Sequence, residues 1–478
     1  MAATYATRAP SPNAPSLSHM SRRKILQVLA GAVAFFVALT GFSAGRYVLA
    51  NPNEPLQQNL ASWARNKGLG GVVDQLEAWL HNDPPAVAPA DTLALLPADT
   101  EPPQDTIAPS TTTGSPTSSV PSNTGSATTL KPGGTSAPAQ QTSRVRTTSC
   151  PNIGPTTTTS IAPTTTAVPT TTTTSTTTTS STIPGETTTT TTTTTTLPAR
   201  PTDITPQVTP ALRGEGQWVS VMRVRTKPII YASSIRPLWC YGSVVATMAT
   251  YDPNKVRAAL FNGNEVPGGK GWRNTSKIKG SAKKSLIASF NGGFRFEHSP
   301  GGYITEGKIV QKMRKGYATF GIRADGTSTV GVWGKNMTND GTWTSLRQNL
   351  PPLVHEGKVV YHTYDKVDWG KDFGNKVYNF RSAVCVRTDG LMMFVAVGKV
   401  NIALLADTLL VLGCSTAMEL DINGTWPFFA VYQDFGKIDR VGRTIDTRMG
   451  DPQRHLNGST KDFFGLFDPE TLAPGSVR

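Results

Sequence analysis

The sequence predicts an α+β fold for a sheet-rich C-terminal domain at residues 201–478, with few helices. Short apolar runs in this region repeatedly end in Asp-Gly or Gly-Gly pairs, as at Asp325-Gly326 and Asp389-Gly390, which favour antiparallel hairpins. Only residues 401–412 carry a long helical pattern. Because strands and helices do not alternate regularly, an antiparallel sheet is favoured over a doubly wound parallel one.

A membrane anchor is predicted at residues 25–45, after a basic cytoplasmic tail at residues 1–24. The run is uncharged and follows Arg22-Arg23-Lys24. At 1.5 Å per residue it would reach about 31 Å, enough to cross a bilayer core. The preceding basic cluster predicts a cytoplasmic N-terminus and an extracellular C-terminal domain. The alternative is a cleaved signal peptide ending near Val48-Leu-Ala50, but the apolar run exceeds the usual core of such peptides.

Two further segments separate the anchor from the domain. Residues 46–83 are expected to be helical and close to the membrane, with two short amphipathic helices inside residues 59–80, where Gly68 and its neighbours interrupt the pattern. Residues 84–200 are dominated by Thr, Ser, Pro and Ala. They carry too little apolar surface to offset the entropy of ordering, so a disordered, O-glycosylated spacer is predicted.

The excess of positive charge belongs to the C-terminal domain. Residues 1–199 hold 10 Lys and Arg against 9 Asp and Glu, which leaves 36 against 23, or +13, for residues 200–478. A basic surface attracts polyanions, and outside a cell phosphate-containing glycans are the expected ones. The basic residues are scattered and form no nucleic-acid-binding motif, so nucleic acid is not predicted as a partner. A surface that only keeps the domain soluble explains the charge equally well.

The most informative segment is Ala417–Trp426, within a predicted strand–turn–strand–helix–strand unit. The unit starts with a strand from Arg381 to the turn at Asp389-Gly390, and continues with the apolar strand 391–398 and the helix 401–412. In the last strand Met418, Leu420 and Ile422 alternate with Glu419, Asp421 and Asn423. Period-two alternation puts both carboxylates on one face, roughly 6–7 Å apart, where each would alter the pKa of the other. A solvated strand face with two ordinary acids is the alternative.

A second informative segment is the strand 286–290 and the turn Asn291-Gly292-Gly293 that follows it. Adjacent glycines allow positive φ and let backbone N–H groups approach a ligand closely. An ordinary hairpin turn is the competing interpretation.

Taken in order, these segments resemble the phosphodiester glycosidase family. Its domains are of the N-acetylglucosamine-1-phosphodiester α-N-acetylglucosaminidase type. The resemblance is carried by NGGF at 291–294, FGIRADG at 320–326, RSAVCVRTDG at 381–390, LLADTLLVLG at 404–413 and the acid-bearing strand. The resemblance covers about residues 200–478. The sequence is most similar to an actinobacterial, membrane-anchored branch of the family, which segments 214–218 and 347–353 also resemble. The resemblance implies a glycosidase with its site at strand ends.

The family's functional positions map onto this chain residue by residue. Arg381, Asp421 and the turn Asn291-Gly292-Gly293 match its motifs, whereas Ile422 and Asn423 stand where two glycines are usual, followed by Gly424-Thr425. Arg381 suits a phosphate, because its planar fork matches phosphate oxygens. Asp421 and Glu419 suit the carboxylate roles at an anomeric carbon. Substrate contacts are expected from Asn291, Gly292 and Gly293 and from Asn423, Gly424 and Thr425.

No cofactor is predicted. The cysteines and histidines lack zinc-site spacing, and a divalent cation held by the acid pair with Asn423 is a minor alternative. Among the domain cysteines Cys240, Cys385 and Cys414, we expect Cys385 and Cys414 to form a disulfide outside the membrane. The leading hypothesis is a hydrolase of a sugar 1-phosphodiester. The second is a non-catalytic module that binds anionic wall glycans, and the third is a scaffold that recruits partners through residues 59–80.

Overall fold

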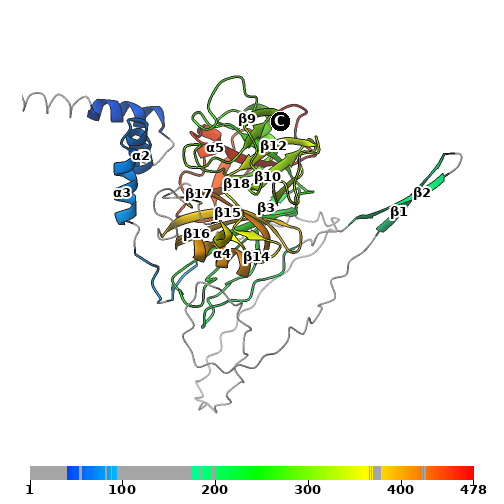
Figure 1. Ribbon diagram of the computed structural model, residues 1–478, viewed down its shortest axis with the longest axis horizontal. Helices are drawn as coiled ribbons and strands as arrows, with labels where there is room; N and C mark the ends of the chain where they lie inside the picture. Colours follow the sequence, from blue (N-terminus) through cyan, green and yellow to red (C-terminus); the bar gives the residue numbers. More distant parts are fainter. Residues whose placement is uncertain are drawn as a thin grey trace, which may run out of the picture. The chain divides into compact units, whose positions relative to one another are not determined.

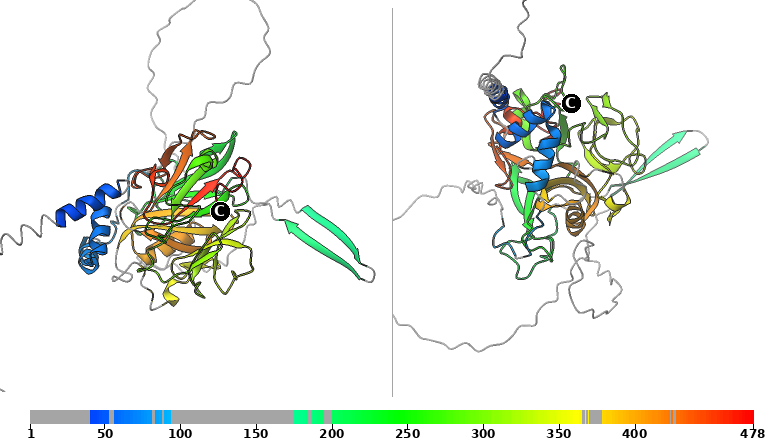
Figure 2. Two further views of the ribbon diagram at one scale, coloured as in Figure 1. Left: turned by 90° about the horizontal axis from the view of Figure 1, so that it is seen from above. Right: turned by 60° about the vertical axis from the view of Figure 1, so that its left-hand side comes forward.

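The structure is a computed structural model, and it divides into two compact units, residues 1–73 and 74–478. The described residues are 40–52, 56–80, 83–87, 89–93, 175–183, 186–194, 200–364, 367, 369, 378–422, 424 and 427–478. Figures 1 and 2 show the sheets of the C-terminal domain from three directions.

Helices dominate the described residues near the N-terminus. Residues 40–50 are helical, and α2 (Leu56–Asn66) and α3 (Gly70–Leu80) follow. The two helices predicted within residues 59–80 are therefore confirmed, and the chain turns between them at Gly68, whose φ is 81°. Residues 25–39 of the expected anchor lie outside the described residues. Among those that are described, no helix has the length and apolarity needed to cross a membrane.

Most of the expected linker, residues 84–200, also lies outside the described residues, but two described parts differ from a disordered spacer. Strands β1 (Ser175–Ile183) and β2 (Glu186–Thr194) pair as an antiparallel hairpin. Threonine is β-branched and favours extended backbone, so a Thr-rich segment can pair as two strands. In addition, the Ala90 backbone N–H donates to the Gly242 carbonyl at 2.9 Å and the Ser243 hydroxyl donates to the Ala86 carbonyl at 2.5 Å. The contacts of the domain therefore begin before residue 201.

Three antiparallel sheets build the C-terminal domain. The eight-stranded sheet has the order β14-β13-β17-β15-β16-β5-β4-β3, and the two five-stranded sheets have the orders β19-β18-β7-β20-β6 and β11-β10-β12-β8-β9. In the eight-stranded sheet the strands are β3 (Val219–Val224), β4 (Lys227–Ile235), β5 (Ala246–Tyr251), β13 (Val354–His355), β14 (Lys358–Val359), β15 (Asn379–Arg387), β16 (Met392–Val400) and β17 (Cys414–Ile422). The predicted sheet-rich architecture with few helices is confirmed.

The remaining elements belong to the two smaller sheets and to short helices. The sheet that contains β7 consists of β6 (Arg257–Phe261), β7 (Leu286–Asn291), β18 (Phe429–Gln433), β19 (Val441–Thr444) and β20 (Phe463–Phe467). The third sheet consists of β8 (Tyr303–Thr305), β9 (Lys308–Gln311), β10 (Ala318–Arg323), β11 (Ser328–Val332) and β12 (Trp343–Gln348). The helical segments are α4 (Ile402–Val411), α5 (Arg454–Asn457) and the 3₁₀ turns Gly280–Ser285 and Tyr361–Thr363.

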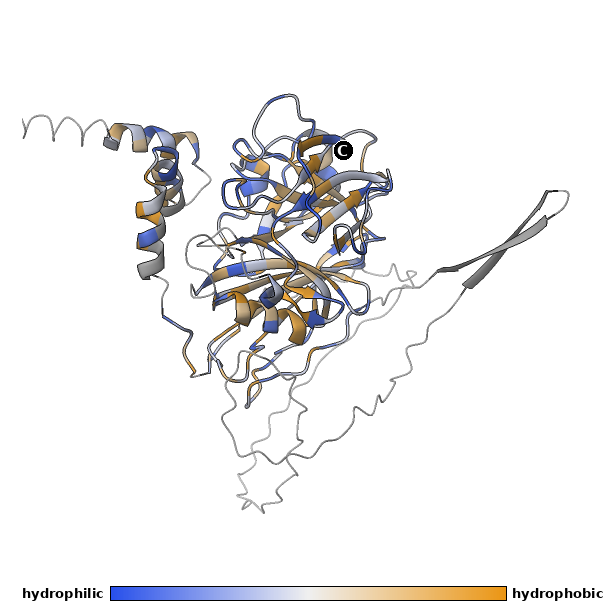
Figure 3. Cartoon of the chain, in the orientation of Figure 1, coloured by the Kyte–Doolittle hydropathy of each residue, from blue (hydrophilic) through white to orange (hydrophobic). Residues whose placement is uncertain are grey.

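Both faces of the eight-stranded sheet are buried. On β15, Val384 belongs to one hydrophobic cluster together with Phe290 and Phe464 of the sheet that contains β7. The next residue, Cys385, belongs to a second cluster together with Leu405 of α4. Period-two alternation therefore serves two cores, and α4 covers one face of the sheet (Figure 1), with apolar residues coloured orange in Figure 3.

The predicted unit around residues 381–422 is confirmed. It consists of β15, a turn with Gly390 at φ 84°, β16, α4 and β17. The Asn401 side chain caps α4 by accepting from the Leu404 N–H at 3.0 Å, and Gly413, at φ 78°, follows the helix as expected. Strand β15 lies between β16 and β17, so the strands that carry Arg381 and Glu419 are direct neighbours.

The last fifty residues form regular structure, although their content of Gly, Asp and Arg is typical of loops. They contain β18, β19, α5 and β20, and β20 lies between β7 and β6 inside its sheet. The run Phe463–Phe467 is buried throughout. Its aromatic side chains pack on both faces, and this apolar content outweighs the loop-like composition of the flanking residues.

The expected disulfide joins Cys385 on β15 to Cys414 at the start of β17, with 29 residues of sequence separation, and the described residues include no free cysteine. Cross-linking restricts the unfolded chain. We expect the Cys385→Ser/Cys414→Ser double variant to lose about 2–4 kcal/mol of unfolding free energy in urea titrations. Reducing the wild type should lower stability similarly, and equal stability of the oxidised wild type and the double variant would contradict a stabilising cross-link.

Candidate active site

A β-bulge separates the two carboxylates of β17. The register pairs Ala383 with Glu419 but Arg381 with Ile422, so one residue of β15 faces two of β17. Accordingly, Leu420 packs into the first hydrophobic cluster and Ile422 against the second. A one-residue shift sends the following side chains to the opposite face. The prediction that Glu419 and Asp421 share one face is therefore wrong, and the reason is the bulge.

Asp421 is buried and faces a cation. Its Oδ2 lies 2.5 Å from Lys461 Nζ, and its Oδ1 accepts the Ile422 N–H at 3.0 Å. Its backbone is fixed as well, because the Asp421 N–H donates to the Gly292 carbonyl at 2.9 Å. Burial raises the pKa of Asp421 above its usual value, and the Lys461 ammonium opposes this shift. Mutual repulsion with Glu419, which the sequence suggested, is not the main cause.

Glu419 and Arg381 form a fully buried ion pair, at 2.7 Å between Oε1 and Nη1. Arg381 also donates to the carbonyls of Val400 at 3.0 Å and Trp369 at 2.9 Å. Burial raises the pKa of Glu419 to about 7, against the opposing effect of Arg381. The guanidinium predicted to hold phosphate is thus engaged by a carboxylate and two carbonyls inside the protein, so the geometry favours a structural role for the pair.

Asn291, at the end of β7, ties three segments together. Its Oδ1 accepts the Phe428 N–H at 2.8 Å, and its Nδ2 donates to Ser382 Oγ at 3.1 Å. The Ser382 hydroxyl in turn donates to the Asp421 carbonyl at 2.6 Å. Asn291 therefore fixes the strand ends of β7, β15 and β17 around Asp421.

The two glycines after Asn291 are required for close packing rather than for positive φ. Neither appears among the residues with positive φ, contrary to the expectation. A Cβ at Gly293 would lie 2.9 Å from Arg347 Nη2, and one at Gly292 would collide with Asp462. Arg347 and Asp462 are themselves a buried ion pair, at 2.8 Å. The Gly292 N–H donates to the Asp462 carbonyl at 3.0 Å, so in this structure the turn serves a protein partner.

Replacing Gly292 with alanine should therefore destabilise the protein by about 1–3 kcal/mol, because overpacking displaces buried groups. The new Cβ would lie 2.6 Å from the Asp462 carbonyl oxygen and nearer still to its Oδ2. Thermal and urea unfolding would measure the loss. Gly71→Ala in α3 is the matched control, because a Cβ there meets nothing within 4 Å. Equal effects of the two substitutions would argue against close packing at the turn.

Asp421 opens onto a small cavity between the ends of β7, β17 and β20, named here the Asp421 cavity. It is lined by Asn291, Gly292, Asp421, Arg454, His455, Ser459, Lys461 and Asp462. Its volume is about 10 Å³, room for one water-sized molecule. The structure thus joins the predicted Asn291, Gly292 and Asp421, while Arg381 and Glu419 are not among the lining residues.

Five of the eight residues that line the cavity were not among the predicted site residues: Arg454, His455, Ser459, Lys461 and Asp462. Arg454 and His455 lie on α5, and Lys461 and Asp462 directly precede β20. A sequence signal for these residues was the Lys461-Asp462 pair directly before the apolar run FFGLF. Charged residues next to a buried strand require partners inside the protein.

His455 belongs to a buried hydrogen-bond chain. Its Nδ1 lies 2.7 Å from Ser289 Oγ, which lies 2.8 Å from the Tyr432 hydroxyl. The ring stacks on Phe463 with centroids 3.9 Å apart. Burial, followed by the nearby Arg454 charge, holds the pKa of His455 well below 6.5. The imidazole is therefore neutral near pH 7, and His455 is one of the residues that line the Asp421 cavity.

The remaining predicted contacts are only partly described. Gly424 has a positive φ of 48° and is exposed, whereas Asn423 and Thr425 lie outside the described residues. Among the described residues, no three His, Cys, Asp or Glu side chains gather as a metal site would require. The cation next to Asp421 is instead the ammonium of Lys461.

Comparisons with known proteins agree with the motif analysis. Residues 284–422 match the family model of phosphodiester glycosidases. The catalytic domain of zebrafish N-acetylglucosamine-1-phosphodiester α-N-acetylglucosaminidase, auto-inhibited by its pro-peptide, is 18% identical, with 52% of this chain and 87% of that chain covered and a TM-score of 0.35. A hypothetical protein from Synechocystis is 11% identical, with 51% and 63% covered and a TM-score of 0.34. No curated protein matches.

The family match spans β7 through β17, and it includes the turn Asn291-Gly292-Gly293, Arg381 and Asp421. The resemblance inferred from the ordered motifs is thereby confirmed for residues 284–422, which match the family model of phosphodiester glycosidases.

Proposed function

We propose that this chain is a membrane-anchored extracellular hydrolase that cleaves a sugar 1-phosphodiester, of N-acetylglucosamine type, in cell-envelope glycans. The observation that carries the proposal is the Asp421 cavity, in which a buried carboxylate, two cations and a neutral imidazole meet at the edge of the matched domain. The anchor rests on the apolar run 25–45, and the envelope substrate on the Thr-rich segment and the basic domain.

Each lining group suits one part of the reaction. Water attacks the anomeric carbon, the bond from that carbon to the bridging oxygen breaks, and a phosphate monoester leaves with the oxygen. Arg454 and Lys461 offer positive charge to the phosphate. Asp421 stabilises the oxocarbenium-like charge on the sugar or activates the water, and neutral His455 accepts or returns a proton.

The size of the cavity requires a rearrangement before a substrate is bound. A space of about 10 Å³ holds a water molecule but no sugar phosphate. Lys461 has a flexible four-carbon stem and a side chain that is 10% exposed. We infer that its ammonium leaves Asp421 for the incoming phosphate, which opens the cavity and frees the carboxylate in the same movement.

The test is turnover of an aryl phosphodiester of N-acetylglucosamine 1-phosphate by the full-length chain. Released sugar and aryl phosphate should appear together, and oxygen from labelled water should enter the sugar. Label in the phosphate would indicate phosphodiesterase chemistry and overturn the glycosidase mechanism. The Lys437→Ala variant, at an exposed ion pair, should retain the wild-type rate and serves as the matched control.

A second candidate is a non-catalytic module that binds anionic wall glycans. Ile422 and Asn423 in place of the family's glycines favour it, as do the net charge of +13 and the carboxylate of Asp421 already paired with Lys461. Saturable, salt-sensitive binding of purified wall polymer, without turnover of any phosphodiester, would support this candidate over the hydrolase.

A further inference from the structure

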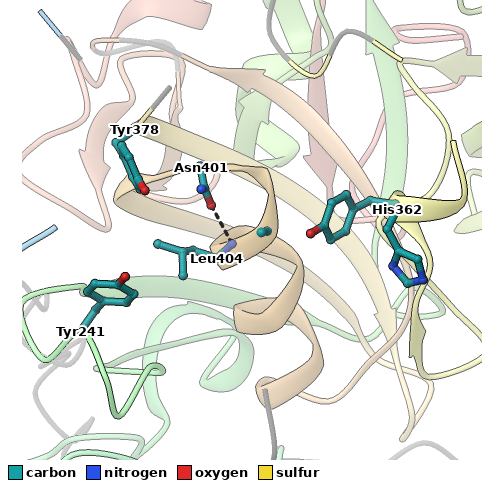
Figure 4. A pocket seen from close by; sticks show the side chains of 7 residues that line it. Tyr241, His362, Tyr378, Asn401 and Leu404 are labelled. Carbon is teal, nitrogen blue, oxygen red and sulfur yellow. Dashed lines mark hydrogen bonds between the residues drawn. The ribbon is translucent and has the colours of Figure 1, made fainter. Parts of the chain in front are cut away.

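A larger cavity opens at the beginning of α4, and its wall is rich in tyrosine. Tyr241, Tyr361, Tyr378, His362 and Asn401 line it together with the first turn of the helix. We name it the tyrosine pocket. Its volume is about 560 Å³, within the range of roughly 300–1,000 Å³ that is usual for small-molecule sites. Figure 4 shows Tyr241 and Tyr378 on one side of the helix start and His362 on the other.

The polar groups of this pocket are available to a ligand. Asn401 uses its Oδ1 to cap α4, which leaves its amide N–H groups as donors. In the part of the chain that the structure describes, the phenol hydroxyls of Tyr241, Tyr361 and Tyr378 have no hydrogen-bond partner, and none of the three is a buried unsatisfied group. Burial raises the pKa of Tyr361 and Tyr378, so both hydroxyls remain protonated and able to donate.

The described part of the wall consists of neutral polar, aromatic and aliphatic side chains, with no Asp, Glu, Lys or Arg among them. Against these residues a charged ligand would lose hydration without gaining a counter-ion. Aromatic faces combined with neutral donors fit a molecule that has apolar C–H faces and many hydroxyl groups. Sugar rings have both.

We propose that the tyrosine pocket binds a neutral saccharide, one or two sugar rings long, as a site separate from the Asp421 cavity. The proposal does not require the hydrolase activity. The pocket wall nevertheless reaches the buried core of the domain, because the Tyr361 ring contacts that of Trp369, with centroids 6.3 Å apart, and the Trp369 carbonyl accepts from Arg381. A glycan chain held here would be attached to the same rigid sheet that carries Asp421.

A proline-rich peptide is the main rival occupant, since such peptides also dock on aromatic grooves. Two of the chain's own residues, Ala86 and Ala90, hydrogen-bond to Ser243 and Gly242, directly after Tyr241. Neither is among the described lining residues, and an apolar peptide would leave the hydroxyl and amide donors of the pocket only partly satisfied. The saccharide accounts for both the ring faces and the donors.

The experiment is a calorimetric titration of the full-length chain with N,N′-diacetylchitobiose and with maltose, with a synthetic peptide of residues 84–92 as the rival ligand. We expect saturable binding of at least one disaccharide, weakened about tenfold by Tyr241→Ala and by Tyr378→Ala. Tyr378→Phe, which keeps the ring, tests the hydroxyl alone and should weaken binding less. Tyr317→Ala, a partly buried tyrosine outside the pocket, is the matched control.

Two outcomes would overturn the proposal: no disaccharide binding by a folded chain, or binding that the tyrosine variants leave unchanged. Preferential binding of the peptide would likewise reject it in favour of the rival. The Asp421→Asn variant should still bind the disaccharide. Failure of the hydrolase hypothesis, seen as absence of turnover, is therefore distinguishable from failure of the saccharide site, seen as absence of binding.

Discussion

The Asp421→Asn variant is expected to turn over an aryl phosphodiester of N-acetylglucosamine 1-phosphate about 10²–10⁴-fold more slowly than the wild type, the usual contribution of an acid–base group. Asparagine preserves the size of the side chain but supplies neither a base nor a negative charge for the sugar. Steady-state kcat and KM measured with the same preparation would show whether the loss falls on kcat. Asp434→Asn is the matched control, because that aspartate is 43% exposed and forms a surface ion pair with Lys437.

Unchanged turnover by Asp421→Asn would remove Asp421 from the mechanism, and with it the main support for the Asp421 cavity as the active site. A loss seen equally in Asp434→Asn would point to a general folding defect. Circular dichroism of both variants separates the two explanations.

The value of kcat/KM should fall on the acidic side of the pH profile and stay level on the alkaline side near neutrality. The ionised form of Asp421 is the active one, and burial raises its pKa above the usual 3.8. As the pH falls, kcat/KM should therefore decline at a higher pH than an exposed aspartate would give. His455, with its pKa well below 6.5, is already neutral near pH 7 and should add no second loss there. A decline on the alkaline side near neutrality would contradict this assignment.

Removing the positive end of the buried ion pair is expected to have the largest effect on stability. Arg381→Met leaves the fully buried Glu419 without its cation and leaves two carbonyls without their donors. An uncompensated buried charge costs about 3–5 kcal/mol. Denaturant unfolding at pH 8, where Glu419 is largely ionised in the wild type, would measure the loss. Lys437→Ala, at an exposed pair, should cost no more than about 1 kcal/mol.

A double variant, Arg381→Met/Glu419→Leu, tests the cause. It removes both charges, so it should regain part of the lost stability, although the carbonyls of Val400 and Trp369 stay without donors. Continued turnover by this variant would indicate that the ion pair has a structural role. Complete inactivity of a folded double variant would indicate that Arg381 takes part in catalysis or in phosphate binding. No recovery of stability at all would contradict the buried-charge explanation.

The sign of the pH effect on stability follows from Glu419. Its pKa is raised in the folded state from the usual 4.5 to about 7. Its stabilising contribution is therefore complete below pH 4.5 and is lost as the pH rises through about 7. Glu419→Gln should flatten this part of the stability curve, which urea titrations at several pH values would detect.

Local patterns in the sequence predicted much of the framework. The helix at 401–412, with Asn401 as its cap and Gly413 as its stop, appears as α4. The apolar strand before it and the Asp-Gly turn appear as predicted. These features depend on residues close together in the chain, where capping, alternation and turn chemistry act directly. Strand β20 was missed because its five buried residues are flanked by segments that have the composition of loops.

The sequence by itself determined the strand–helix unit. It also pointed to Cys385 and Cys414 as the expected pair among three domain cysteines, and to Asp421 and the turn at Asn291 as candidate site residues. Only the tertiary structure decided what those residues touch. The bulge opposite Ser382 turned Asp421 away from Glu419, and the segment before the last strand brought Lys461 to its carboxylate across 40 residues of sequence. Alternation within one strand contains no information about the register of its neighbour. The partners of a buried charge depend on that register and on which distant segment closes the core.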